Sequence, residues 1–121
     1  MATLEIPRSE WISFFDSFSN RHRGWLITME IMSADLGDQV EVRDLPLEGI
    51  TPELRGENDE FEITVGDEKD RHLSKTIFGA HNVWLKQNDE GADEALEIDA
   101  KTEKVLLLLR AGASTDRVSA S

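Results

Sequence analysis

The sequence predicts an α+β domain in which one N-terminal amphipathic helix packs on a curved, mostly antiparallel six- to seven-stranded sheet or partial barrel. Three observations predict this fold. Apolar residues first recur with the period of a helix, the period changes to two after Gly24, and short alternating runs then follow between polar turns. A chain of 121 residues can bury one core, so residues 1–110 are predicted to form a single domain.

The N-terminal helix is the best-defined element of this pattern. Ser9 is the expected N-cap, and Gly24 is expected to end the helix in the left-handed conformation. A helix of this length is marginal in isolation, so we expect its aromatic face to dock on the sheet. That face consists of four rings spaced i, i+3, i+4 and i+7: Trp11, Phe14, Phe15 and Phe18.

A hairpin is predicted directly after the helix. Residues 25–32 alternate so that Ile27, Met29 and Ile31 share one face with Trp25, and residues 39–45 alternate after a turn-rich segment. Residues 46–56 then carry two prolines and Gly49, which interrupt a central strand but still include apolar side chains. We expect an irregular edge segment there.

The remaining strands are predicted as a meander. Residues 94–110 could form a helix by composition, but Leu96 and Ile98 alternate with acids and the apolar run 105–109 is short. We therefore predict a hairpin there, with the helix as the alternative. Residues 111–121 are small and polar and are expected to form a flexible C-terminal tail. The strands before this hairpin are expected at residues 61–65, 73–78 and 83–87.

Composition excludes several classes of function. The chain carries 25 acidic and 13 basic residues, and this net charge of −12 should repel nucleic acid. We interpret the acid excess as a solvated surface, with adaptation to a salt-rich cytoplasm as the alternative. It has no long apolar run and no N-terminal signal pattern, so we expect no membrane partner and a cytoplasmic location. The absence of cysteine excludes disulfides and thiolate chemistry.

Three sequence motifs are distinctive in combination: Ile6-Pro7-Arg8-x-x-Trp11-x-x-Phe14-Phe15, His22-Arg23-Gly24-Trp25, and Asp44-Leu45-Pro46-Leu47-Glu48-Gly49-Ile50. With them the chain resembles a bacterial family known only as a domain of unknown function. The similarity runs from about Ile6 to Arg110. This resemblance implies bacterial relatives but transfers no activity and no catalytic or binding residue.

Residues that carry chemistry are sparse. The sequence contains no phosphate loop, dinucleotide fingerprint, nucleophile elbow or His-Glu-x-x-His motif, so we predict no catalytic, cofactor-binding or metal-binding residues and no cofactor. Acidic turns such as residues 57–60 are interpreted as solvated. Two candidate contacts remain. Arg21, His22 and Arg23 could contact an anion or simply stabilise the end of the helix, and Trp84 could lie in an interface or in the core.

The sequence alone assigns no function. The favoured hypothesis is a non-catalytic, soluble interaction module that forms a homodimer or binds a protein partner through an apolar sheet face or a strand edge. The alternative is a half-barrel that binds a small ligand, with enzymatic activity as an option. That alternative requires an internal cavity that the aromatic side chains of the helix leave empty. The favoured hypothesis predicts a protein that is not an enzyme, and the alternative leaves enzymatic activity open.

Overall fold

The computed structural model describes residues 2–66 and 72–111. It contains one α-helix, α1 (Trp11–Arg21), and two 3-10 turns, η1 (Arg8–Glu10) and η2 (Gly56–Asn58). The strands are β1 (Ala2–Glu5), β2 (Leu26–Ser33), β3 (Gly37–Glu53), β4 (Glu60–Gly66), β5 (His72–Phe78), β6 (Ala80–Gln87), β7 (Asp93–Ala100) and β8 (Glu103–Arg110). The predicted α+β class with one N-terminal helix is confirmed.

The eight strands form one open antiparallel sheet in the order β1-β6-β7-β8-β2-β3-β4-β5. The predicted count of six to seven strands is therefore wrong, and of the two predicted forms, a curved sheet or a partial barrel, the open sheet is the one observed. The additional strand is β1, whose four residues are all exposed and whose alternation of Ala2 and Leu4 with Thr3 and Glu5 is too short to predict a strand. The sheet is not a barrel because β1 and β5 lie at opposite ends of the strand order.

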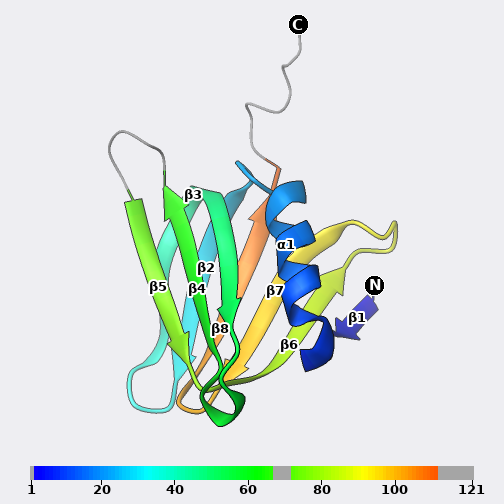
Figure 1. Ribbon diagram of the computed structural model, residues 1–121. Coiled ribbons are helices and arrows are strands. Elements are labelled where there is room, and N and C mark those ends of the chain that lie inside the picture. The colour runs from blue at the N-terminus through cyan, green and yellow to red at the C-terminus, as the bar shows by residue number, and fades with distance from the viewer. Residues whose placement is uncertain (1, 67–71, 112–121) are drawn as a thin grey trace, which may run out of the picture.

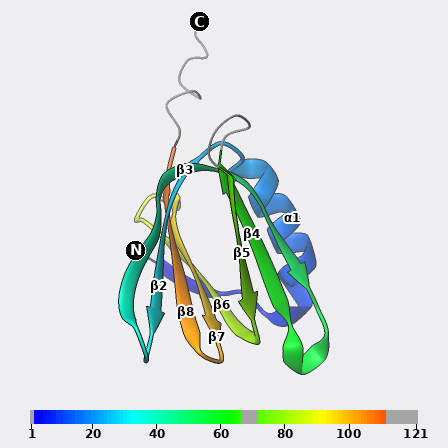
Figure 2. The same cartoon turned by 90° about the vertical axis from the view of Figure 1, so that its left-hand side faces the viewer.

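Strand β3 bends the sheet into two layers. Its first half, to Pro46, pairs with β2, and its second half, from Leu47 to Glu53, pairs with β4. Register shifts on both sides of the bend and a left-handed backbone at Asp44, with φ 54°, accompany the change of partner. Figures 1 and 2 show the two layers facing each other: one consists of the second half of β3 with β4 and β5, and the other consists of the remaining strands. Helix α1 lies beside the second half of β3.

The predicted irregularity of residues 46–56 is thus wrong for most of that segment, because residues 46–53 belong to β3, although one side of this stretch is an edge. Each half of β3 has one neighbouring strand, so alternate amides point away from the ladder and can be replaced by proline. The Leu47 amide donates toward β2, which turns the preceding Pro46 nitrogen away from that strand. The Ile50 amide points to α1, and Pro52, two residues later, faces the same side.

The core lies between the two layers. The aromatic face of α1 docks there as predicted: Trp11, Phe15 and Phe18 are at most 2% exposed, and Phe14 packs against them. Phe61 of β4 lies at the centre, with its ring centroid 5.1 Å from that of Trp11 and 4.8 Å from that of Phe15. The aromatic side chains of α1 therefore fill the interior that an internal ligand would have to occupy.

The two ends of α1 differ in how well the sequence predicted them. Ser9 is not the N-cap: the helix begins after η1, and Glu10 precedes it without a side-chain cap bond. The Glu10 amide instead donates to the Pro7 carbonyl at 2.8 Å, which forms the tight 3-10 turn. Gly24 has φ 88°, which confirms the predicted left-handed stop.

The predicted C-terminal hairpin is confirmed, because β7 and β8 pair directly and the alternative helix does not form. Leu96 and Ile98 of β7 and Val105 and Leu107 of β8 are fully buried, so the strand alternation and not the helical composition determines this segment. The predicted tail, residues 111–121, lies outside the described residues except for Ala111.

The free edge of the second half of β3 is closed by a side chain of α1. Ser19 Oγ accepts a hydrogen bond from the Ile50 amide at 2.9 Å and donates to the Ile50 carbonyl at 3.3 Å. A single buried hydroxyl therefore satisfies both backbone groups of one edge residue, as a neighbouring strand would.

We expect Ser19→Ala to lower the free energy of unfolding by about 1–3 kcal/mol, because both Ile50 backbone groups stay buried without partners. Urea denaturation measures this loss. Ser13→Ala is the matched control, because the Ser13 hydroxyl is exposed and donates to the Glu10 carbonyl within the same helix. Equal losses in the two variants would contradict the role of Ser19.

Candidate functional site

The predicted anion-binding cluster contacts a carboxylate of the protein itself. Asp93 of β7 lies beside the C-terminal end of α1, and its Oδ2 is 3.1 Å from Arg21 Nη1 and 3.2 Å from His22 Nε2. Arg23 is not part of this group, because its Nη2 donates to the Asn20 side chain at 3.0 Å. The structure therefore brings Arg21 and His22 together on one internal anion and leaves Arg23 apart.

The imidazole ring of His22 is buried among neighbouring side chains. It is 3% exposed, and its ring centroid lies 4.2 Å from that of Phe18 and 4.6 Å from that of Trp25. Nδ1 lies 2.8 Å from the Phe18 carbonyl. Burial lowers the pKa of His22, while the Phe18 carbonyl and Asp93 oppose that shift. This arrangement ties the helix to the start of β7 and leaves the ring no open side for a substrate.

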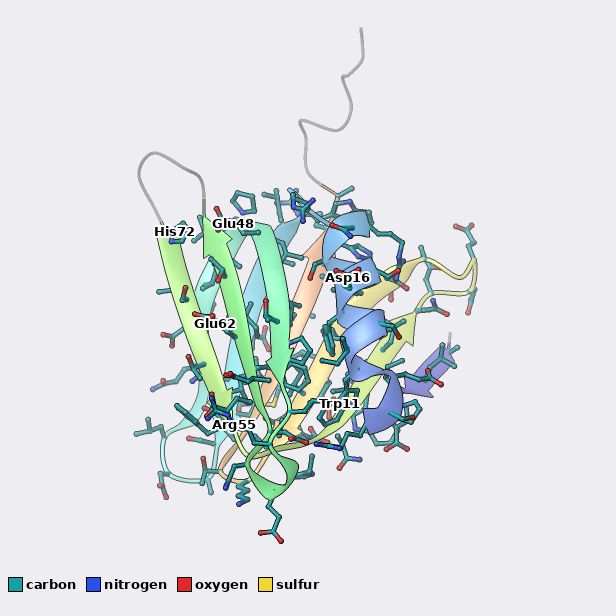
Figure 3. All side chains as sticks on the ribbon, viewed as in Figure 1. Trp11, Asp16, Glu48, Arg55, Glu62 and His72 are labelled. Carbon is teal, nitrogen blue, oxygen red and sulfur yellow. The ribbon has the colours of Figure 1, made fainter. Side chains whose placement is uncertain are left out.

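A groove of about 490 Å³ runs between α1 and the end of β3. Its ionisable lining includes Asp16 on the helix, Glu48 on β3 and Arg23 at the far end. A second hollow of about 410 Å³ continues across β3, β4 and β5 and is lined by three glutamates that include Glu62. Figure 3 shows Asp16 and Glu62 on α1 and β4, and Glu48 beside His72, whose Nε2 is 2.9 Å from Glu48 Oε1.

Neither hollow contains a candidate metal site among the residues that the structure describes. Both are open at the surface, and no group of three or more His, Asp or Glu side chains in residues 2–66 and 72–111 could hold a metal ion. The histidine nearest to them, His72, is exposed and paired with Glu48.

Trp84 lies on the side of β6 that faces away from the core. Its neighbours Val83 and Leu85 are buried, whereas Trp84 is partly exposed and its Nε1 donates to Asp99 Oδ2 at 3.1 Å. In register it lies opposite Glu97 of β7, which lies opposite Leu106 of β8. Trp84 is thus a surface residue and not a core residue.

Side chains of β6, β7, β8 and β2 that alternate with core residues form a continuous surface, which we call the outer face. Leu108, at its centre, is 37% exposed. The outer face combines apolar side chains with charges of both signs, and it consists of Thr28, Glu30, Trp84, Lys86, Glu97, Asp99, Lys104, Leu106, Leu108 and Arg110.

One structurally important residue escaped the sequence analysis. Asp59 lies in an acidic turn interpreted as solvated, yet its side chain is 2% exposed and accepts two hydrogen bonds from the Arg8 guanidinium. It also accepts from the Arg55 amide at 2.6 Å. The one available signal was Arg8 in the N-terminal motif, because a buried acid generally requires a cation partner.

No helix among the described residues is long and apolar enough to cross a membrane. Comparison with known proteins gives a family and one relative. The family described as "Family of unknown function (DUF5335)" matches residues 2–118. A bacterial protein of Aquifex aeolicus (strain VF5), described as uncharacterized, is 27% identical over 110 residues, which cover 91% of this chain and 94% of the relative. No solved structure matches this chain.

Proposed function

This chain belongs to the DUF5335 family of unknown function, and we propose that it is a non-catalytic interaction module that self-associates through the outer face. The observation that carries the proposal is the partly exposed Trp84, which shares the outer face with Leu106 and the exposed Leu108. Tryptophan and neighbouring aliphatic side chains are typical of the centre of protein interfaces.

Charge supports a second copy of the chain as the partner. Two molecules that each carry −12 repel one another, so a stable contact requires a region where the acid excess is absent. The side chains that define the outer face include three bases (Lys86, Lys104, Arg110) and three acids (Glu30, Glu97, Asp99), and Asp44 of β3 pairs with Arg110 at 3.0 Å. A surface that carries charges of both signs in similar numbers can complement itself across a two-fold axis.

The strand edges favour association through a face over strand addition. Lys75 of the edge strand β5 is 23% exposed and pairs with Glu103 at 3.2 Å, and a partly buried lysine on an edge strand opposes pairing with another chain. The end of β3 is covered by α1 through Ser19. At the other end of the sheet, β1 offers four residues, which are too few for a stable ladder.

The N-terminal motif supports a structural interpretation of the family signature. Trp11 Nε1 donates to the Ile6 carbonyl at 2.8 Å, Arg8 binds Asp59, and Phe15 is fully buried. We propose that the Ile-Pro-Arg-x-x-Trp-x-x-Phe-Phe helix signature marks the family because it docks α1, without a chemical role. Its side chains hold the fold and line no catalytic site.

A small-ligand site remains the second candidate, and the groove between α1 and β3 is the observation that favours it. Because the interior is filled by aromatic rings, a ligand would have to bind in this open groove. Exposed Ile12, at 55%, is its apolar wall. We further propose a cytoplasmic setting without a nucleic-acid partner, supported by the net negative charge and the lack of cysteine.

We expect Trp84→Ala to weaken self-association by about thirtyfold or more, which corresponds to the loss of one interface hot spot. Sedimentation equilibrium and native mass spectrometry measure the dissociation constant. Leu108→Asp should have the same effect without affecting the core, because Leu108 is already 37% exposed.

The matched control is Ile12→Ala, which removes an exposed aliphatic side chain from the α1–β3 groove and should leave the dissociation constant unchanged. A wild-type protein that stays monomeric at high concentration would refute the proposal. So would equal association of wild type and Leu108→Asp. A small molecule retained by the wild type and lost in Ile12→Ala would support the second candidate instead.

A further inference from the structure

The outer face includes a carboxyl group, that of Asp99 near the end of β7, which is incompletely hydrogen bonded. Asp99 Oδ2 accepts from Trp84 Nε1, but Asp99 Oδ1 is buried and accepts no hydrogen bond from any residue in the described part of the chain. A buried charged oxygen without a donor is unfavourable, whereas a protonated carboxyl can use the same oxygen as a donor.

Asp99 has a carboxylate neighbour, Glu97, and a cation, Lys104, which lies opposite it in register but forms its ion pair with Glu97. Glu97, two residues earlier on β7, projects to the same side and lies within hydrogen-bonding reach of Asp99. The nearby bases contact Glu97 instead. Lys86 Nζ of β6 lies 3.2 Å from Glu97 Oε1, and Lys104 Nζ of β8 lies 3.5 Å from Glu97 Oε2.

Asn82, the polar residue of β6 closest to Asp99 in register, forms its hydrogen bonds with other residues. Asn82, which lies opposite Asp99 in register, donates to Glu5 of β1 at 2.9 Å and is 2.8 Å from His81 Nδ1. Burial and the adjacent Glu97 raise the pKa of Asp99, with Trp84 and Lys104 acting in the opposite direction. The pKa of Glu97 is lowered: burial acts against this, but hydrogen bonds with Asp99 and Lys86 outweigh it.

We infer that self-association through the outer face takes up a proton on Asp99, which then donates from Oδ1 to Glu97, so that acidification strengthens the association. This inference rests on the proposed function. A second copy that covers the outer face removes the remaining water from this pair, and loss of water penalises two adjacent carboxylates more than one. The protonated pair carries one negative charge, which Lys86 and Lys104 already hold in place.

The test is the dissociation constant of the wild type between pH 7.5 and 5.5 at about 0.5 M salt, which screens the general repulsion between acidic surfaces. We expect association to be about tenfold or more tighter at the lower pH, because linkage permits up to tenfold per pH unit for each proton taken up. Asp99→Asn should associate at pH 7.5 as tightly as the wild type at pH 5.5, with little further change on acidification.

Asp38→Asn is the matched control, because Asp38 is an exposed acid of β3 next to the outer face and should leave the wild-type pH dependence intact. If Asp99→Asn does not fold, dilution calorimetry of the wild type in two buffers of different ionisation enthalpy counts the protons directly. The expected uptake is up to one proton per subunit.

The outcomes separate the two proposals. A wild type that does not associate at any pH refutes the proposed function. A wild type that associates with no proton uptake, or with a pH dependence that Asp99→Asn retains in full, overturns the inference about Asp99 and leaves the association face standing.

Discussion

Phe15→Ala is expected to lower the free energy of unfolding by about 3–5 kcal/mol. The Phe15 side chain is fully buried, and its ring packs at 4.8 Å from that of Phe61 on β4 and at 5.0 Å from that of Phe14. Deleting it leaves a cavity at the place where α1 and the second layer meet, and neighbouring aromatic rings cannot collapse into it without moving the helix. Because small domains are stable by about 5–15 kcal/mol, the variant should be near its unfolding threshold.

Urea denaturation followed by circular dichroism measures this change. Phe78→Ala is the matched control, since Phe78 at the end of β5 is 63% exposed and its truncation should change stability by about 0.5 kcal/mol or less. If the two variants lose similar stability, Phe15 is not the central packing residue that its contacts indicate.

Asp59→Ala is expected to lower the free energy of unfolding by about 2–4 kcal/mol. Removing one partner of a buried ion pair has a large effect, but Arg8 is 51% exposed and regains water when Asp59 is lost, which moderates the effect. The variant also leaves the Arg55 amide, at 2.6 Å from Asp59 Oδ1, without its acceptor. Glu57→Gln, an exposed acid in the same turn, should remain within about 0.5 kcal/mol of the wild type.

The lowered pKa of Asp59 also makes the free energy of unfolding depend on pH. The hydrogen bond from Arg8 lowers the pKa of Asp59 from 3.8, and burial opposes this shift. A carboxyl with a lowered folded-state pKa contributes stability above the unfolded-state value, and this contribution is lost as pH falls through the folded-state value. The gap in unfolding free energy between wild type and Asp59→Asn should therefore narrow as pH falls below about 3.8. A gap that stays constant to pH 2 would contradict this assignment.

Local periodicity was enough to predict most of the fold. The 3.6-residue period identified α1 through its buried aromatic face, and alternation identified seven of the eight strands, including the hairpin of β7 and β8. Two elements escaped for physical reasons. Strand β1 buries none of its side chains, and its alternation spans only four residues, which is too short to predict a strand. The prolines of β3 predict an interrupted strand, but each occupies a position whose backbone nitrogen points away from the partner strand.

The candidate site was harder to predict, because long-range partners decide the role of its charged residues. Asp59 and Arg8 are 51 positions apart, and Asp93 and Arg21 are 72 apart. Nothing in the local sequence distinguishes these acids from the solvated acids in the turns. Trp84 had apolar neighbours on both sides, so its side of the strand could be assigned only once the register with β7 was known.

The position of β8 in the strand order has a consequence for synthesis of the protein. β8 lies between β7 and β2, so within the hydrogen-bonded sheet it is the strand that joins β1, β6 and β7 to β2, β3, β4 and β5. A ribosome completes it after every other strand that the structure describes. Until residues 103–110 emerge, the two groups of strands expose the flanks that β8 will fill, and the nascent chain depends on late closure of the sheet to bury its core.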